Sequence, residues 1–312
     1  MTAMFVSFHV LVGLAFVTGV TWEWLGLALS SYAVRMFAVT AGSHRYFSHR
    51  AFKTNRLVQF LLAWVAQLSF QRGVLWWAAR HRQHHKHADT AEDLHSPVRM
   101  GFWWSHVGWF LSRRYESTDS DAIKDFSRFP ELVWLNDYWF VPGVSALALT
   151  WFLGGLPAVV WAGIIPTVLV WHASFAINSL GHLFGKRRYL TPDTSRNSAW
   201  LALLTLGEGW HNNHHRSQGS TRLGWFWWEL DPTFFVLKFL SWVGVVRDLR
   251  PVRPEVKYCF REYTVEQRAL LVEQSAFGKF EPLTRVATPE SQAAVSPPAE
   301  PQREHVGFRS VG

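Results

Sequence analysis

Residues 138–180 read "YWFVPGVSALALTWFLGGLPAVVWAGIIPTVLVWHASFAINSL" and contain two long apolar runs. The runs, 138–153 and 157–180, are separated only by a Gly-Gly-Leu break. About 20 apolar residues in a helix cross the hydrocarbon core of a bilayer, so each run has about the required length, the first at its short end. This stretch therefore predicts a transmembrane helical hairpin.

A second pair of apolar runs lies at 4–20 and 25–42, with "TWEW" between them. We interpret it as another hairpin, which predicts an all-α integral membrane protein with four transmembrane helices. The composition agrees, because 19 Trp and 24 Phe accompany a 49% hydrophobic content. A signal peptide would have a basic start and a small-residue cleavage site, and residues 1–20 have neither, so we expect them to form a span.

The basic residues predict the orientation of these helices. Of the 31 Lys and Arg, 13 lie between the two hairpins, 17 follow the fourth run, and Arg35 lies inside the second run. By the positive-inside rule, both termini and the segments 43–137 and 183–255 face the cytoplasm and form a helical cap. Anionic lipid headgroups explain the net charge of +8, so we expect an inner or plasma membrane protein with no nucleic acid partner.

The remaining segments complete the predicted organisation. The apolar stretches 57–70 and 234–246 are too short to cross a bilayer, and we expect interfacial helices there, the second starting at Asp231–Pro232. Residues 1–255 then form one membrane domain, 256–287 a C-terminal extension and the Pro-rich 288–312 a disordered tail. Cys259 is the only cysteine, which excludes a disulfide or an iron–sulfur cluster bound by this chain.

Most of the 15 histidines fall in four groups at the cytoplasmic ends of the predicted spans or in the cap. "HRQHH" (81–85) and "HNNHH" (211–215) each place imidazoles at i, i+3 and i+4, on one helix face about 100° wide. "NSLGH" (178–182) puts Asn178 and His182 on one face in the same way. "HRYFSH" (44–49) has its histidines five apart, which predicts a helix end or turn there.

The number of histidines indicates more than one metal ion. The four groups hold nine imidazoles, too many for one ion and suited to two, and the residue types alone leave iron, copper and zinc open. Glu92-x-x-His95 has no second copy, so we treat it as a coincidence. We also leave out the isolated or off-register histidines, namely His9, His87, His95, His106 and His172.

In these motifs the chain resembles membrane fatty-acyl desaturases of the stearoyl-CoA, Δ9 type. The resemblance rests on "AGSHRYFSHR" (41–50), "HRQHHKHADT" (81–90), "GFWWSHVGWFL" (101–111), "NSLGHLFG" (178–185) and "GEGWHNNHH" (207–215), and it covers about residues 4–255. It implies that nine histidines bind two iron ions and that Asn178 reaches one iron through water. The implied ligands are His44, His49, His81, His84, His85, His182, His211, His214 and His215.

The resemblance also implies the reaction. Molecular oxygen is activated at the reduced di-iron site, two hydrogens leave adjacent methylenes, and a cis double bond remains in the acyl chain. No haem-binding HPGG signature is present, so a separate ferredoxin-like or haem protein and its reductase must supply the electrons. Unactivated C–H bonds offer no acid to a side-chain base, and therefore a redox metal is required.

Substrate contacts are implied by position alone. Gln71, Trp77 and Ser174 match residues that shape the kink of the family's acyl tunnel, and Arg113 and Arg114 match basic residues near CoA. The Arg–Asp pair of animal acyl-CoA enzymes is replaced by Ala79–Arg80. The sequence therefore leaves both CoA and a membrane lipid as carriers of the acyl chain, with the headgroup near Arg80.

Two other functions remain as alternatives. A related histidine-box hydroxylase would place oxygen on the carbon instead of removing a second hydrogen. A membrane metal-binding protein or transporter would have ligands near the middle of its spans, whereas these ligands lie at span ends and in the cap.

Overall fold

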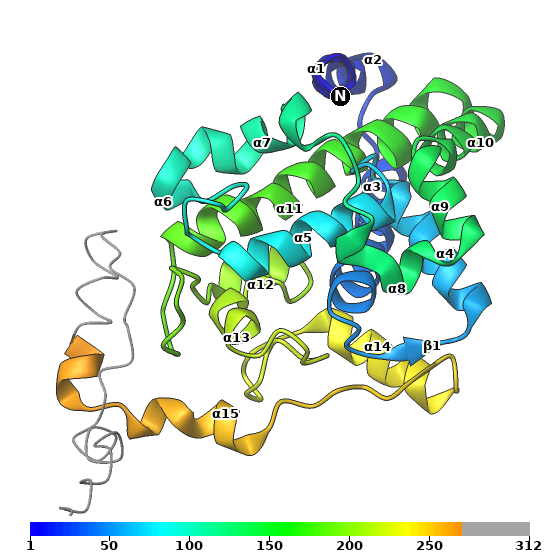
Figure 1. Ribbon diagram of the computed structural model, residues 1–312. Helices are drawn as coiled ribbons and strands as arrows, with labels where there is room; N and C mark the ends of the chain where they lie inside the picture. Colours follow the sequence, from blue (N-terminus) through cyan, green and yellow to red (C-terminus); the bar gives the residue numbers. More distant parts are fainter. Residues whose placement is uncertain (270–312) are drawn as a thin grey trace, which may run out of the picture.

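The structure is a computed structural model that describes residues 1–269, and these residues are mostly helical (Figure 1). Its helices and strands, in chain order, are α1 (Thr2–Leu11), η1 (Val12–Leu14), α2 (Ala15–Thr18), α3 (Trp22–Phe37), η2 (Ala38–Ser48), β1 (Lys53–Thr54), α4 (Arg56–Gln67), α5 (Val74–His87), α6 (Pro97–Met100), η3 (Trp104–Gly108), α7 (Trp109–Leu111), η4 (Arg113–Tyr115), η5 (Asp121–Ile123), α8 (Lys124–Ser127), α9 (Pro130–Asp137), α10 (Val141–Ala158), η6 (Val159–Ile164), α11 (Ile165–Leu183), α12 (Ala199–Leu204), α13 (His211–Arg216), α14 (Pro232–Trp242), β2 (Val246–Arg247), α15 (Pro254–Tyr258) and η7 (Cys259–Glu262).

The predicted apolar runs are helical. Within residues 1–269, two helices are long and apolar enough to cross a membrane, Trp22–Ser48 and Val141–Leu183, and the apolar helix Thr2–Thr18 is shorter. The second of these bends sharply at Gly154 and Gly155, where Gly155 has a φ of +62° that residues with a side chain rarely adopt. The Gly-Gly break therefore divides α10 itself, and the part after the break continues into η6 and α11. Helix α11 runs through the middle of the molecule (Figure 1).

Helix α3 does not end at residue 42, as the apolar run predicts, but continues as the π-helix η2 to Ser48. The His49 N–H donates to the His44 carbonyl, 3.3 Å away, which is a five-residue hydrogen bond. This wider turn brings the two imidazoles together, with ring centroids 4.9 Å apart. The helix end predicted between them is present, with His49 as the C-cap.

Arg35 is buried inside the predicted second span and links three segments. Its guanidinium donates to the carbonyls of Leu68 and Ala162 and to the Thr167 hydroxyl, at 2.6 to 3.0 Å. Leu68 lies directly after α4, Ala162 lies in the π-helix η6 and Thr167 lies in α11. Carbonyls at a helix end or in a π-helix lack ordinary partners, so Arg35 satisfies them where water is absent.

Two elements outside the long helices position the site. The Asp231 carboxylate accepts the Phe234 N–H at 3.0 Å, with Pro232 at the first helical position, which confirms the predicted start of α14. Strands β1 and β2 pair antiparallel, with Lys53 opposite Arg247. The pairing fixes the segment after η2 against the C-terminal part of the cap. The predicted extension is described to residue 269, and the predicted tail 288–312 lies outside the described residues.

Candidate metal centre

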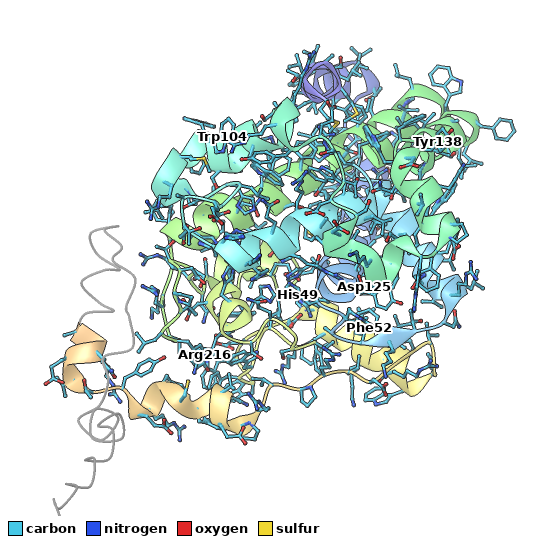
Figure 2. All side chains as sticks on the ribbon, in the orientation of Figure 1. His49, Phe52, Trp104, Asp125, Tyr138 and Arg216 are labelled. Atoms are coloured by element: carbon cyan, nitrogen blue, oxygen red, sulfur yellow. The ribbon has the colours of Figure 1, made fainter. Side chains whose placement is uncertain are left out.

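Five imidazoles from three segments converge on one point, which we call the first cluster. Their ring nitrogens all lie within 4.8 Å of one another. The segment η2 with its C-cap supplies two of them, α5 supplies two and α13 one. The members are His44, His49, His81, His85 and His214. Figure 2 shows His49 near the centre of the view, below α5.

The contacts inside the first cluster join Nε2 atoms. His214 Nε2 lies 3.0 Å from His44 Nε2 and 2.8 Å from His85 Nε2. His81 Nε2 lies 2.9 Å from Nε2 of both His49 and His85. Two imidazole nitrogens bound at right angles to one ion at ~2.1 Å are ~3.0 Å apart, against ~3.4 Å at a tetrahedral angle. The spacing is therefore compatible with these imidazoles holding one shared ion, which would bind through their Nε2 atoms.

Four further imidazoles form the second cluster, and all four are buried. Their nitrogens lie within 4.8 Å of one another, and His211 Nε2 is 3.1 Å from His182 Nε2. The buried Nε2 of His215 has no hydrogen-bond partner within the described residues. Such a nitrogen needs a ligand, and a metal ion shared with its neighbours would be one. The members are His84, His182, His211 and His215.

The two triplets are divided between the clusters in opposite ways. His84, the middle histidine of "HRQHH", joins the second cluster, while its neighbours join the first. His214, the middle histidine of "HNNHH", joins the first cluster, while its neighbours join the second. Each triplet therefore links both clusters, and the ring centroids of His85 and His215 lie only 4.5 Å apart.

Four carboxylates contact the outer nitrogens of the clusters, and none of them was predicted from the sequence. His182 Nδ1 donates to Asp89 at 3.0 Å, His84 Nδ1 to Asp93 at 3.0 Å and His215 Nδ1 to Asp193 at 2.9 Å. An imidazole that donates through Nδ1 keeps the Nε2 lone pair for a metal. Glu208 Oε2 lies 2.5 Å from His44 Nδ1 in the first cluster.

The ionisation of these groups favours metal binding. Burial lowers the pKa of five imidazoles well below the ordinary value, which keeps them neutral, the form that binds metals; these are His49, His81, His85, His211 and His214. Burial alone would raise the pKa of Asp89, but the charge and hydrogen bond of His182 lower it overall. The carboxylate is therefore ionised and able to orient its imidazole.

Glu208 belongs to a buried charge network beneath the first cluster. Arg45 Nη2 lies 3.0 Å from Glu208 and 3.0 Å from Asp231, and all three groups are buried. Gly207 is packed against Asp231 with a φ of +121°, so a side chain there would be strained and would collide with the network. Arg45 thus connects the first histidine group to the start of α14.

Two adjoining cavities lie beside the clusters. One, of about 40 Å³, is bordered by Met36 and Thr205 and by His44 and His211, one imidazole from each cluster. The other, of about 30 Å³, runs toward Arg80 and Trp109. Four residues border both cavities, namely Trp77, His81, Ser174 and Asn178.

The three residues expected in the tunnel are brought together by hydrogen bonds. Gln71 Nε2 donates to the Ser174 hydroxyl at 3.1 Å, and Trp77 Nε1 donates to Gln71 Oε1 at 3.3 Å. All three border the smaller cavity. Trp77 and Ser174 also border the larger cavity, whereas Gln71 does not.

The three basic residues expected near the headgroup have different surroundings. Arg80 is buried and donates to the Ser117 carbonyl at 2.5 Å and to Gln83 at 2.9 Å, while its Nε has no partner within the described residues. Arg113 and Arg114 are exposed. Arg80 thus borders the smaller cavity, and the other two lie outside it.

The histidines left out of the site lie outside both clusters. His95 is buried and stacked on His84, with ring centroids 4.3 Å apart. His87 pairs with the exposed Glu92. The Glu92-x-x-His95 match therefore does not direct both side chains to one point. The remaining three, His9, His106 and His172, contact one another.

Comparisons with known proteins identify the family of the chain. The family model described as fatty acid desaturase matches residues 21–238. The chain is 36% identical to the sn-1 stearoyl-lipid 9-desaturase of a Synechocystis species, over 79% of this chain and 78% of that protein. It is 33% identical to the sn-2 palmitoyl-lipid 9-desaturase of a Nostoc species, over 80% and 90%.

Another relative is named for a different substrate carrier and position. The acyl-CoA 5-desaturase of Anemone leveillei is 36% identical, over 74% of this chain and 73% of that protein. The resemblance seen in the histidine motifs is thus confirmed across most of the chain. The chain belongs to the membrane fatty acid desaturase family and is an oxidoreductase, an acyl-CoA or acyl-lipid desaturase.

Proposed function

We propose that the chain inserts a cis double bond, at the Δ9 position, into a saturated acyl chain carried on CoA or on a membrane lipid. The nine histidines of the two clusters would bind two Fe²⁺ ions, with Asn178 reaching one of them through water. The observation that carries the proposal is the pair of nitrogen cages beside a cavity that one imidazole of each borders, His44 and His211.

The reaction consumes one O2, two electrons and two protons per double bond and releases two waters. When bound, the irons would supply the one-electron oxidation that an unactivated C–H bond requires. The chain itself would bind the acyl group at the clusters, exclude water and fix which methylenes lie at the metals. Two relatives named as 9-desaturases support the Δ9 assignment, and the 5-desaturase is the main competing position.

The membrane arrangement is part of the same proposal. Four crossings in two hairpins, as predicted from the apolar runs, would put both termini and the clusters on the cytoplasmic side of an inner or plasma membrane. Exposed Phe16, Trp22 and Phe152 on the helices would then face lipid. The first cluster contains three partly exposed histidines. We therefore expect a separate ferredoxin-like or haem protein with its reductase to deliver electrons on that side.

Ser174→Phe should block the acyl cavity without removing metal. Ser174 borders both cavities, and a phenyl ring there would displace the acyl chain from the clusters. Displacing the reacting atoms by ~1 Å costs about 100-fold in rate, and we expect a loss of that order in monoene formation. Bound iron, measured by elemental analysis, should stay unchanged.

Ser30→Phe, at an exposed position of α3, is the matched control and should retain activity. Normal activity of Ser174→Phe would contradict the assigned tunnel.

The products formed in a host that supplies compatible electron donors test the reaction itself. We expect a new cis-Δ9 monoene, whereas a hydroxy acid would identify a hydroxylase and a Δ5 product would correct the position. Labelled stearoyl-CoA and labelled phospholipid, offered separately to the membranes, identify the carrier by which pool becomes unsaturated first. Strict dependence on CoA would show that the Ala79–Arg80 pair does not exclude that carrier.

A further inference from the structure

Three histidines outside both clusters form a continuous hydrogen-bonded chain, which we call the histidine relay: His9, His172 and His106. His9 Nε2 lies 2.9 Å from His172 Nε2, and His172 Nδ1 lies 3.0 Å from His106 Nε2. At one end His9 Nδ1 lies 2.7 Å from the Phe5 carbonyl, and at the other His106 Nδ1 lies 2.9 Å from the Ser179 hydroxyl. The relay therefore joins α1, α11 and η3.

The four hydrogen bonds of the relay determine how many protons its three imidazoles must carry. The Phe5 carbonyl only accepts, so His9 Nδ1 must carry a proton. The Ser179 hydroxyl donates to the Phe175 carbonyl at 3.0 Å and must then accept from a protonated His106 Nδ1. Each of the two nitrogen–nitrogen contacts needs one proton. Four protons are required, whereas three neutral imidazoles carry three, and so this arrangement holds one imidazolium.

A neutral arrangement of the same atoms also exists. If the Ser179 hydroxyl turns toward His106 Nδ1 and donates to it, three nitrogen-bound protons satisfy the whole relay. The bond given up is a serine back-bond to a carbonyl of its own helix, which contributes little to helix stability. One rotation of a hydroxyl thus accompanies the gain or loss of one proton, and all six ring nitrogens stay hydrogen-bonded in both arrangements.

The surroundings of the relay contain no fixed counter-charge. Within the described residues no carboxylate and no Lys or Arg pairs with any of the three imidazoles. His172 is therefore the titratable group that contacts His9 and His106, and these two are the ones that contact His172. The aromatic rings of Phe5 and Phe102 lie against the two end imidazoles, with centroids 4.2 and 5.2 Å away. Aromatic rings stabilise a neighbouring imidazolium through cation–π contact. Because no carboxylate pairs with the imidazolium, no salt bridge fixes the proton on one ring.

The inner end of the relay lies next to the site without bordering either cavity. Ser179 follows Asn178, which borders both cavities, and the hydroxyl of Ser105, next to His106, donates to the Asn178 carbonyl at 3.0 Å. The outer imidazoles, His9 and His172, are half-buried. We propose that the histidine relay carries one exchangeable proton and delivers protons to the cavity beside Asn178. This rests on the proposed function, whose reaction consumes two protons per double bond.

The proton itself is observable in the full-length protein in lipid vesicles, by NMR of ¹⁵N-labelled histidine. Burial lowers the pKa of His106 to about 4, so we expect an imidazolium signal of the relay, in exchange with neutral imidazoles, to grow as the pH falls toward that value. His172→Gln interrupts the relay and should remove this shared signal. His87→Gln, which deletes a histidine outside the relay and the clusters, should keep it. Three neutral imidazoles at every pH at which the protein stays folded would overturn the proposal.

Steady-state kinetics test proton delivery separately from metal binding. His172→Gln should lower kcat by about tenfold or more with an unchanged KM, unchanged iron content and a larger solvent isotope effect. His9→Gln, at the half-buried outer end, is a milder change to packing and should act in the same direction. Wild-type kcat in both variants would overturn the proposal. If wild-type protein bound no iron or formed no monoene, the proposed function would fail instead, while the NMR experiment would still test the relay.

Discussion

His214→Ala should remove the metal of the first cluster and abolish desaturation. His214 Nε2 contacts the Nε2 atoms of His44 and His85, so its loss opens the cage between η2 and α5. Replacing even an outer partner of a metal ligand costs 10–100-fold in affinity or activity, and loss of a ligand should cost at least about 100-fold. We expect bound iron to fall from about two per chain to about one, with activity below detection in a fatty-acid profile.

His87→Ala is the matched control for this loss. His87 belongs to the same histidine-rich segment as His85, but its ring pairs with Glu92 and takes no part in either cluster. It should keep two irons and full activity. If His214→Ala also kept both, while remaining folded by thermal unfolding, the assignment of the first cluster as a metal site would be wrong.

Asp89→Asn should weaken the second cluster without removing any of its nitrogens. The Asp89 carboxylate accepts from His182 Nδ1 and also from the N–H and hydroxyl of Thr194, each at 2.7 Å. All three bonds end on Asp89 Oδ2, so an amide oxygen at that position keeps the acceptor but loses the negative charge, and the NH2 group would meet the Ser96 hydroxyl that donates to Oδ1 at 2.6 Å. His182 would lose its charged partner, and we expect metal affinity at this cluster to fall 10–100-fold. Titration of the purified protein with a competing chelator measures the change.

Glu92→Gln is the control for Asp89→Asn, because this exposed carboxylate lies in the same loop but contacts no histidine of the clusters. Its metal affinity should match the wild type. Equal affinities for all three proteins would show that Asp89 serves only to hold Thr194 and the loop. In that case the carboxylates would be structural and the nitrogen cages alone would determine the affinity.

Much of the site was visible in the spacing of its histidines. The i, i+3, i+4 pattern correctly grouped His81, His84 and His85 on one helix, and the groups at 44–49, 178–182 and 211–215 do come together. The division of each triplet between two clusters was not predictable. It depends on how α5 and α13 cross, and a pattern within one helix does not contain that information.

The carboxylates and the π-helix were missed for different reasons. Asp89 and Asp93 follow "HRQHH" within nine residues and Glu208 precedes "HNNHH", so acidic residues flanking a histidine group were an available signal. Asp193 carries no such signal, since its loop meets His215 only in the folded chain. The π-helix η2 was hidden because hydrophobic periodicity predicts a helix without distinguishing a four-residue from a five-residue hydrogen bond.

The most direct test of two iron-binding nitrogen cages is anomalous X-ray scattering at the iron absorption edge from crystals of the purified protein. We predict two anomalous peaks per chain, one among the Nε2 atoms of the first cluster and one within the second cluster. A single peak, or peaks that appear at the zinc edge and not at the iron edge, would contradict the account.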